Sequence, residues 1–137
     1  MKFNSDKFQA IRFALITSET LYNDGTGANI EQPSVVKDLG IYMSGDLSFE
    51  HHIRTVANKG KRIAGWVLRT FFTRQRDAMI TLLKQLIYPT VEYNSVLWNP
   101  SDQKLIDLLE SVQNNFLKQI YSTELPPDAD YWNRLQH

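Results

Sequence analysis

Residues 34–76, SVVKDLGIYMSGDLSFEHHIRTVANKGKRIAGWVLRTFFTRQR, decide the fold expected of this chain. A short apolar strand in this stretch ends at a Ser-Gly turn, and a long amphipathic segment follows it. Residues 48–76 carry seven of the chain's fifteen basic residues and a single acidic one, Glu50. We therefore expect a strand, a turn and a long helix with a basic face. The residues before this unit are expected to form a supporting sheet, and those after it a helical bundle.

The composition is that of an intracellular globular domain. The chain has 137 residues, enough for one domain with its own core, and hydrophobic residues make up 42% of it. The absence of cysteine excludes a disulfide framework, a Cys-ligated zinc site and a thiol nucleophile, and favours an intracellular location. No run of about 18 apolar residues is present, so no membrane-spanning helix is expected.

Charge is distributed unevenly although the net charge is zero. The basic residues concentrate in residues 48–76, whereas residues 101–130 hold six acidic residues against two lysines. A domain polarised in this way can direct a polyanion to one of its surfaces.

Placing residues 49–76 on a helix at 100° per residue separates two faces. Apolar residues from Phe49 to Phe71 fall in one broad sector, and Gly60 lies among them, where it would allow a neighbouring backbone to approach closely. One interpretation of the opposite face is an ordinary solvent-exposed charged surface. Such surfaces usually combine acidic and basic residues, whereas this face contains almost no acidic residues. The basic residues that share it are Arg54, Lys61, Arg62, Arg69 and Arg76.

The N-terminal third is predicted to form a sheet. Residues 8–17 alternate as a strand, and residues 20–30 read as a hairpin around Asn-Asp-Gly. The Gly-Thr-Gly there is interpreted as a plain turn rather than a phosphate loop, because no helix is expected after it. Residues 35–44 form the next strand, in which Gly40 indicates a bulge or a close backbone approach.

The rest of the chain is predicted to form helices. Asp46 or Ser48 caps the first, a second covers residues 76–94 and is kinked or ended by Pro89, and Ser101 or Asp102 caps a third. The expected fold is α+β, a small antiparallel sheet followed by a three-helix bundle. We expect two parts, residues 1–47 and residues 48–137, the second truncated at its C-terminus.

Catalytic motifs are absent from the sequence. The three histidines are His51, His52 and His137, and the adjacent pair points to different helix faces, which disfavours a zinc site. No nucleophile elbow, Walker loop or paired carboxylates of a two-metal centre occur. The residues alone indicate a binding domain.

Six ordered blocks together resemble the reverse transcriptases of non-LTR retrotransposons, particularly the jockey-like endonuclease–reverse transcriptases of animals. FNSDKFQAIRF resembles the end of the palm, and VVKDLGIYMSGDLSFEHHI the primer grip leading into the thumb. ANKGKRIAGWVLRTF is similar to the first thumb helix, and LIYPTVEYNSVLWNP to the Pro-x-x-Glu-Tyr block of the second. LLESVQNNFLKQI resembles the Glu-x-Val-Gln helix, and YWNRL the signature after it.

The resemblance implies a fragment of an RNA-directed DNA polymerase that is not an enzyme on its own. Polymerisation in the family depends on palm aspartates that hold two Mg²⁺ ions, and this chain begins after them. We therefore expect no cofactor or metal in this chain, with Mg²⁺ bound by the parent polymerase. Lys7 matches a lysine proposed to assist nucleotidyl transfer, although a solvated turn lysine is an equal interpretation. The primer-grip matches are Leu39, Gly40, Ile41 and Tyr42.

The resemblance also gives the basic face a role. A polymerase thumb holds the template–primer duplex through its phosphates, so Arg54, Lys61, Arg62, Arg69 and Arg76 are the expected contacts, with Arg74 and Lys59 next. Lys37 either reaches a phosphate or is a strand-edge charge. The expected partners are an RNA template, an RNA–DNA or DNA primer duplex and the missing fingers and palm, but neither a membrane nor a small molecule. The expected location is the nucleus or a cytoplasmic ribonucleoprotein.

Two alternatives stay open. The first is a non-catalytic helical protein-interaction domain derived from a retroelement, which the acidic C-terminal third favours. The second concerns the aromatic residues: Tyr93 and Trp98 are interpreted as core, whereas Trp66 lies at the edge of the apolar sector and fits either the core or base stacking.

Overall fold

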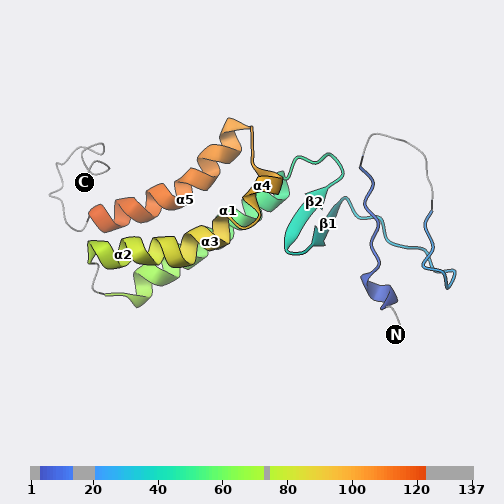
Figure 1. Ribbon diagram of the computed structural model, residues 1–137, viewed down its shortest axis with the longest axis horizontal. Helices are drawn as coiled ribbons and strands as arrows, with labels where there is room; N and C mark the ends of the chain where they lie inside the picture. The colour runs from blue at the N-terminus through green and yellow to red at the C-terminus, as the bar shows by residue number, and fades with distance from the viewer. Residues whose placement is uncertain (1–3, 14–20, 73–74, 123–137) are drawn as a thin grey trace. The chain divides into compact units, whose positions relative to one another are not determined.

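The computed structural model describes residues 4–13, 21–72 and 75–122 (Figure 1). The chain divides into an N-terminal unit, Met1–His52, and a C-terminal unit, Ile53–His137. The division falls in the first turn of the first long helix, whereas the sequence predicts a boundary between residues 47 and 48. A two-stranded antiparallel sheet precedes the helices, which confirms the predicted α+β class.

The sheet is a hairpin, and the predicted single strand over residues 35–44 is wrong. β1 (Val35–Asp38) pairs with β2 (Ile41–Ser44), with Lys37 opposite Tyr42. Leu39 and Gly40 have φ angles of 46° and 84°, and positive φ at both central residues is what a type I′ hairpin turn requires. Gly40 therefore reverses the chain direction and does not form a bulge within a strand.

The residues before the hairpin form less regular structure than predicted. A 3₁₀ turn, η1, covers Ser5–Lys7, and Gln9 makes one isolated parallel bridge to Glu31. The predicted strand over residues 8–17 is therefore wrong across its described part, residues 8–13, because a single bridge does not build a ladder. Its remaining residues lie outside the described ranges.

The Asn-Asp-Gly segment is a plain turn, as predicted. Asp24 accepts hydrogen bonds from the N–H groups of Thr26 (2.9 Å) and Ala28 (3.3 Å), and both Gly25 and Gly27 have positive φ. Hydrogen bonds from Thr26 lower the pKa of the Asp24 carboxyl below its usual range. The Asp24 oxygen is thus committed to its own loop, and no helix of the described residues starts directly after it.

The long helix α1 covers Glu50–Thr70. Asp46 accepts from the Ser48 N–H at 3.1 Å, and Ser48 Oγ accepts from the Glu50 N–H at a long 3.5 Å, with Phe49 at a φ of 52° between them. The predicted cap at Ser48 is therefore one residue outside the helix boundary. The predicted end at residue 76 is also wrong, because α1 stops at Thr70 and the next helix starts at Arg76.

The second helical segment continues through its proline. It consists of α2 (Arg76–Leu82), the π-helical turn η2 (Leu83–Ile87) and α3 (Tyr88–Val91). The Tyr88 N–H donates to the Leu83 carbonyl five residues earlier. This wider turn precedes Pro89, which lacks an N–H and crowds the preceding turn of a regular helix. The predicted end of the helix near Tyr88 is therefore wrong, because the π-helical turn is followed by α3, which contains Pro89 and reaches Val91.

Two further helices complete the C-terminal unit. α4 covers Ser95–Trp98, and Trp98 is buried with its Nε1–H donating to the Tyr93 carbonyl at 2.8 Å. The Tyr93 side chain is exposed, so its predicted place in the core is wrong. α5 covers Gln103–Tyr121 and is capped by Asp102, which accepts from the Lys104 N–H, as predicted.

The core of the C-terminal unit lies between α1, the α2–α3 segment and α5, which run alongside one another (Figure 1). Gly60 on α1 is buried where a Cβ atom would lie 2.8 Å from Val91 and 3.1 Å from Val112. The helices pack closely at Gly60, but the predicted approach of a neighbouring backbone is wrong, because valine side chains from two other helices lie there. The core residues are Ala57, Ala64, Val67, Leu68, Met79, Leu83, Ile87, Val112, Phe116 and Ile120.

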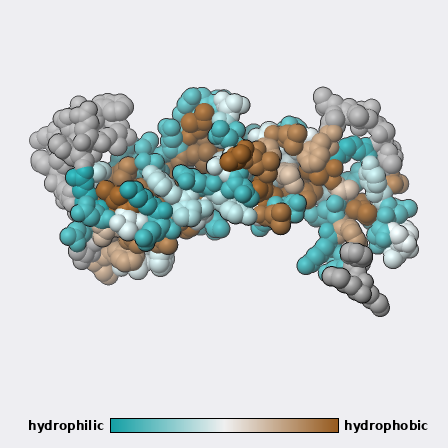
Figure 2. Space-filling model, in the orientation of Figure 1, coloured by the Kyte–Doolittle hydropathy of each residue, from teal (hydrophilic) through white to brown (hydrophobic). Residues whose placement is uncertain are grey.

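The surface of the helical unit mixes hydrophilic residues with hydrophobic patches (Figure 2). Phe71, which the sequence predicts to be buried, is exposed because it follows the end of α1. Among the helices of the described residues, none is both long enough and apolar enough to cross a membrane.

Candidate nucleic-acid interface

The outward face of α1 is basic along most of its length. No acidic residue occurs between residues 51 and 72, so no carboxylate within the helix beyond its first turn neutralises this face. The predicted contacts on it are brought together on one side of a single helix, because their spacing matches the helical period. The exposed basic residues of α1 are Arg54, Lys59, Lys61, Arg62 and Arg69.

Arg62 lies between two shallow depressions of this face. Lys59, Ile63 and Trp66 line the first with it. Lys61, Gly65 and Arg69 line the second with it, together with Leu68 and with Gln119 from α5. A Cβ atom at Gly65 would meet no atom within 4 Å, so the surface is open at the centre of the second depression. The Arg69 Nε–H donates to the Gly65 carbonyl at 3.2 Å, which holds that side chain along the helix.

Trp66 adds an aromatic ring to the basic face. Its side chain is 52% exposed and lines a depression with Arg62 and Lys59, which lie one and two turns earlier on the helix. From the sequence, Trp66 fits either a place in the core or a role in base stacking, and in the structure its side chain lies at the surface. Aromatic rings beside cationic side chains are the combination that binds unpaired bases and their phosphates.

Arg76 does not belong to the α1 face. It opens α2, and its guanidinium lies 5.1 Å from the centroid of the buried Tyr121 ring at the end of α5. The prediction that Arg76 shares the basic face of α1 is wrong, because it assumed one continuous helix to residue 76. This cation–π contact joins α2 to α5, while the predicted contact of Arg76 with nucleic acid stays a prediction. Arg74 lies outside the described residues.

The hairpin brings two other predicted residues together. Lys37 Nζ lies 5.3 Å from the centroid of the Tyr42 ring, its cross-strand partner. His51, in the first turn of α1, packs edge-on against the same ring with centroids 4.9 Å apart. Leu39 at the hairpin tip is 81% exposed, whereas Ile41 is buried. Of the four primer-grip matches, Leu39 and Gly40 are therefore exposed at the tip.

His52 is a residue whose role the sequence does not reveal. It is buried, and its Nδ1 accepts a hydrogen bond from the Tyr42 N–H at 3.2 Å. Burial, and secondarily the charge of His51, lowers the pKa of the His52 imidazole. His52 therefore fixes β2 against the start of α1 in its neutral form. The sequence shows only that two histidines are adjacent, and this pattern does not predict that His52 is buried or that it contacts Tyr42.

Lys7, which the resemblance implies for nucleotidyl transfer, lies in a short 3₁₀ turn. Lys7 is exposed at the end of η1, where its N–H donates to the Asn4 carbonyl at 3.1 Å. Within the described ranges, no group of three or more His, Cys, Asp or Glu side chains is arranged to hold a metal ion.

The chain is similar to one uncharacterized protein, B0403.1 of Caenorhabditis elegans. The two are 27% identical over 100 residues, which is 73% of this chain and 50% of that protein. The chain thus spans about half the length of the curated relative it matches. No protein-family model matches the chain, and no solved structure matches it.

Proposed function

We propose that this chain is the primer-grip and thumb region of a reverse transcriptase of the non-LTR retrotransposon type and holds the template–primer duplex. The observation that supports it best is the face of α1, where five exposed basic residues occur with no acid between residues 51 and 72. A surface of one sign along about 22 Å of helix, from Arg54 to Arg69, suits the regular phosphates of a duplex.

Lysine and arginine contacts on such a face position the duplex without reading its sequence. An RNA–DNA hybrid is close to A-form, in which the major groove is too narrow for side chains, so contacts fall on phosphates and on the minor groove. Arg62 is the central contact, because it borders both depressions of the face.

The hairpin is proposed to touch the primer end. Leu39 holds a left-handed backbone conformation that costs a leucine about 1–2 kcal/mol, yet its side chain gains little from packing at 81% exposure. An exposed apolar side chain at a strained turn favours a contact outside the chain. Lys37, stacked on Tyr42, adds a cation on the same hairpin for a phosphate.

The proposed role is to hold nucleic acid, not to catalyse. The palm aspartates and their Mg²⁺ ions belong to the parent polymerase implied by the resemblance, and Lys7 would assist only there. The proposed location is the nucleus or a cytoplasmic ribonucleoprotein.

Binding of an RNA–DNA hybrid at several salt concentrations tests this function. Neutralising five phosphates predicts a slope of log K against log salt of roughly −4, and a slope near zero would refute the proposal. Changing Arg62 and Arg69 to Glu is expected to abolish binding. The matched control changes Lys84 and Lys104 to Glu, two exposed lysines on η2 and α5, and is expected to bind almost as the native chain does.

A further inference from the structure

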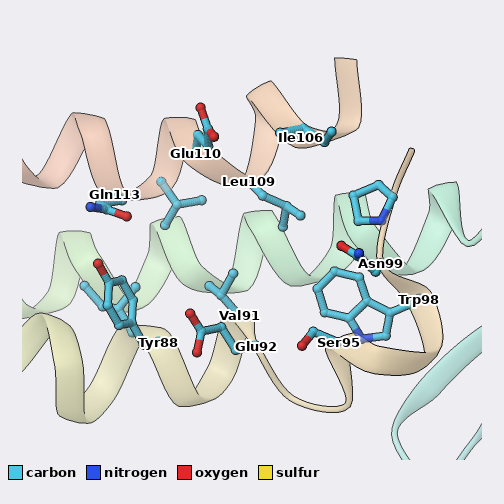
Figure 3. Close-up of a pocket in the computed structure, with 13 residues that line it drawn as sticks. Tyr88, Val91, Glu92, Ser95, Trp98, Asn99, Ile106, Leu109, Glu110 and Gln113 are labelled. Carbon is cyan, nitrogen blue, oxygen red and sulfur yellow. The ribbon is translucent and has the colours of Figure 1, made fainter. Parts of the chain in front are cut away.

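The C-terminal unit contains a cavity of about 270 Å³ between α3, α4 and α5. Its floor is apolar, and Figure 3 shows Val91 and Leu109 lying between the α3 and α5 ribbons, with the Trp98 indole beside them. The apolar side chains that line it are Ile87, Val91, Trp98, Ile106, Leu109 and Val112.

The rim of the cavity is acidic. Glu92 follows α3 and Glu110 lies on α5, so the two carboxylates come from different helices (Figure 3). Both side chains are exposed, and none of the described residues that line the cavity is Lys, Arg or His. Burial, together with the charge of Glu92, raises the pKa of the Tyr88 phenol in the same lining, which agrees with a negative potential there. The cavity therefore favours a cation and repels phosphate.

The size of the cavity limits what it can hold. Cavities that enclose a whole small-molecule ligand usually measure about 300–1,000 Å³, so this one suits one or two side chains. An arginine or lysine side chain matches both the apolar floor and the acidic rim of the cavity. Its aliphatic stem packs on the apolar floor, and its charged head lies at the carboxylates of the rim.

Exposed apolar residues extend the surface beyond the cavity. Tyr93, Val96 and Leu97 are exposed, Val96 to 97%, and they alternate along the chain with the lining residues Glu92, Ser95 and Trp98. Exposed apolar residues that neighbour the lining residues in the sequence are available to a partner that docks at the cavity. An occupant that covers them must be larger than the side chain in the cavity, which favours a peptide segment over a small ligand.

We propose that the α3–α5 cavity is a docking site for a peptide segment of another protein that inserts an arginine or lysine flanked by apolar residues. The site is separate from the basic face of α1 in its charge and in its residues. It goes beyond the proposed function, and it would give a chain that holds nucleic acid a protein partner as well.

Three labelled peptides test the proposal on the full chain by fluorescence anisotropy. They share a capped sequence with Leu on both sides of one central position, which is Arg, Gln or Glu. The Arg peptide is expected to bind about tenfold more tightly than the Glu peptide, with the Gln peptide between them. Equal binding of the three, or no saturable binding of the Arg peptide up to millimolar concentration, would overturn the proposal.

Variants locate the binding. Changing Glu92 and Glu110 together to Gln is expected to reduce the Arg-over-Glu preference to less than about twofold. Asp107→Asn is the matched control, an exposed acid on α5 that does not line the cavity, and it should keep the preference. A preference that survives the double change would refute the assignment. Self-association that the double change abolishes would instead identify a second copy of the chain as the occupant.

Discussion

The Tyr42 backbone N–H donates a hydrogen bond of 3.2 Å to Nδ1 of His52, and this contact joins the second strand of the hairpin to the first turn of α1. The imidazole is 2% exposed, and Nδ1 must be unprotonated to accept the bond. The contact therefore depends on the neutral form of His52. Tyr42 is one of the four primer-grip matches, and its strand follows the hairpin tip at Leu39 and Gly40.

The first prediction is a loss of stability at acidic pH. The pKa of His52 is lowered in the folded chain relative to an unfolded value of about 6.5, so the unfolded state binds the proton first. The stabilisation is fully present above pH 6.5 and is lost as the pH falls through the interval between 6.5 and the lower folded pKa. Urea unfolding at a series of pH values measures it.

A variant isolates the His52 contribution from the other titrating groups. His52→Gln is expected to be less stable at pH 7.5 by about 1 kcal/mol and to lose less stability on acidification. His51→Gln, at the exposed neighbour, should keep most of the native pH dependence. Equal pH dependence of the native chain and His52→Gln would contradict the prediction.

The second prediction concerns the strained hairpin tip. Leu39→Asn is expected to raise the free energy of unfolding by about 0.5–1 kcal/mol, because Asn tolerates positive φ and Asn-Gly favours the type I′ turn. Leu39→Ala is the control, since it removes the exposed side chain but keeps the backbone penalty, and it should give no gain. A loss of stability in Leu39→Asn would show that the leucine side chain packs within the chain.

The third prediction compares two glycines of α1. Gly60→Ala places a methyl group 2.8 Å from Val91, and the overpacking cost of about 1–3 kcal/mol exceeds the helix-propensity gain of about 1 kcal/mol. Gly65→Ala meets no atom within 4 Å and keeps the gain. The first change is therefore expected to lower the melting temperature and the second to raise it. The same direction in both variants would refute the close packing at Gly60.

Periodicity predicted the parts of the fold that depend on one helix at a time. It placed the apolar and basic faces of α1 and put Gly60 among the buried residues. The capping preference limited the start of α5 to Ser101 or Asp102, and the structure has Asp102. Periodicity missed the end of α1, because Phe71 continues the apolar period and neither glycine nor proline marks Thr70 as the last residue. It also missed the hairpin turn, because Leu39-Gly40 lacks the Asn or Asp that usually signals positive φ.

The candidate site was predictable to a similar degree. Helical spacing alone brings Arg62 and Arg69 to one face, whereas the exposure of Trp66 and the burial of His52 depend on how the segments pack. Arg76 shows most clearly where prediction from helical spacing fails. Helical spacing does not reveal the break between α1 and α2, so it assigned Arg76 to the basic face, whereas the structure has it in contact with Tyr121.

The fourth prediction separates duplex binding from the binding of unpaired bases at Trp66, and it rests on the proposed function. Bases inside a duplex are already stacked on one another, so we expect the exposed indole to stack on an unpaired base. Trp66→Leu is expected to weaken binding of a hybrid with a single-stranded template overhang by about tenfold and to change blunt-hybrid binding by less than about twofold. Phe72→Leu, a change at an aromatic residue that is 94% exposed after the end of α1, is the control and should affect neither. Equal weakening of both hybrids in Trp66→Leu would assign the indole to the duplex contact, whereas no weakening of either would remove Trp66 from the interface.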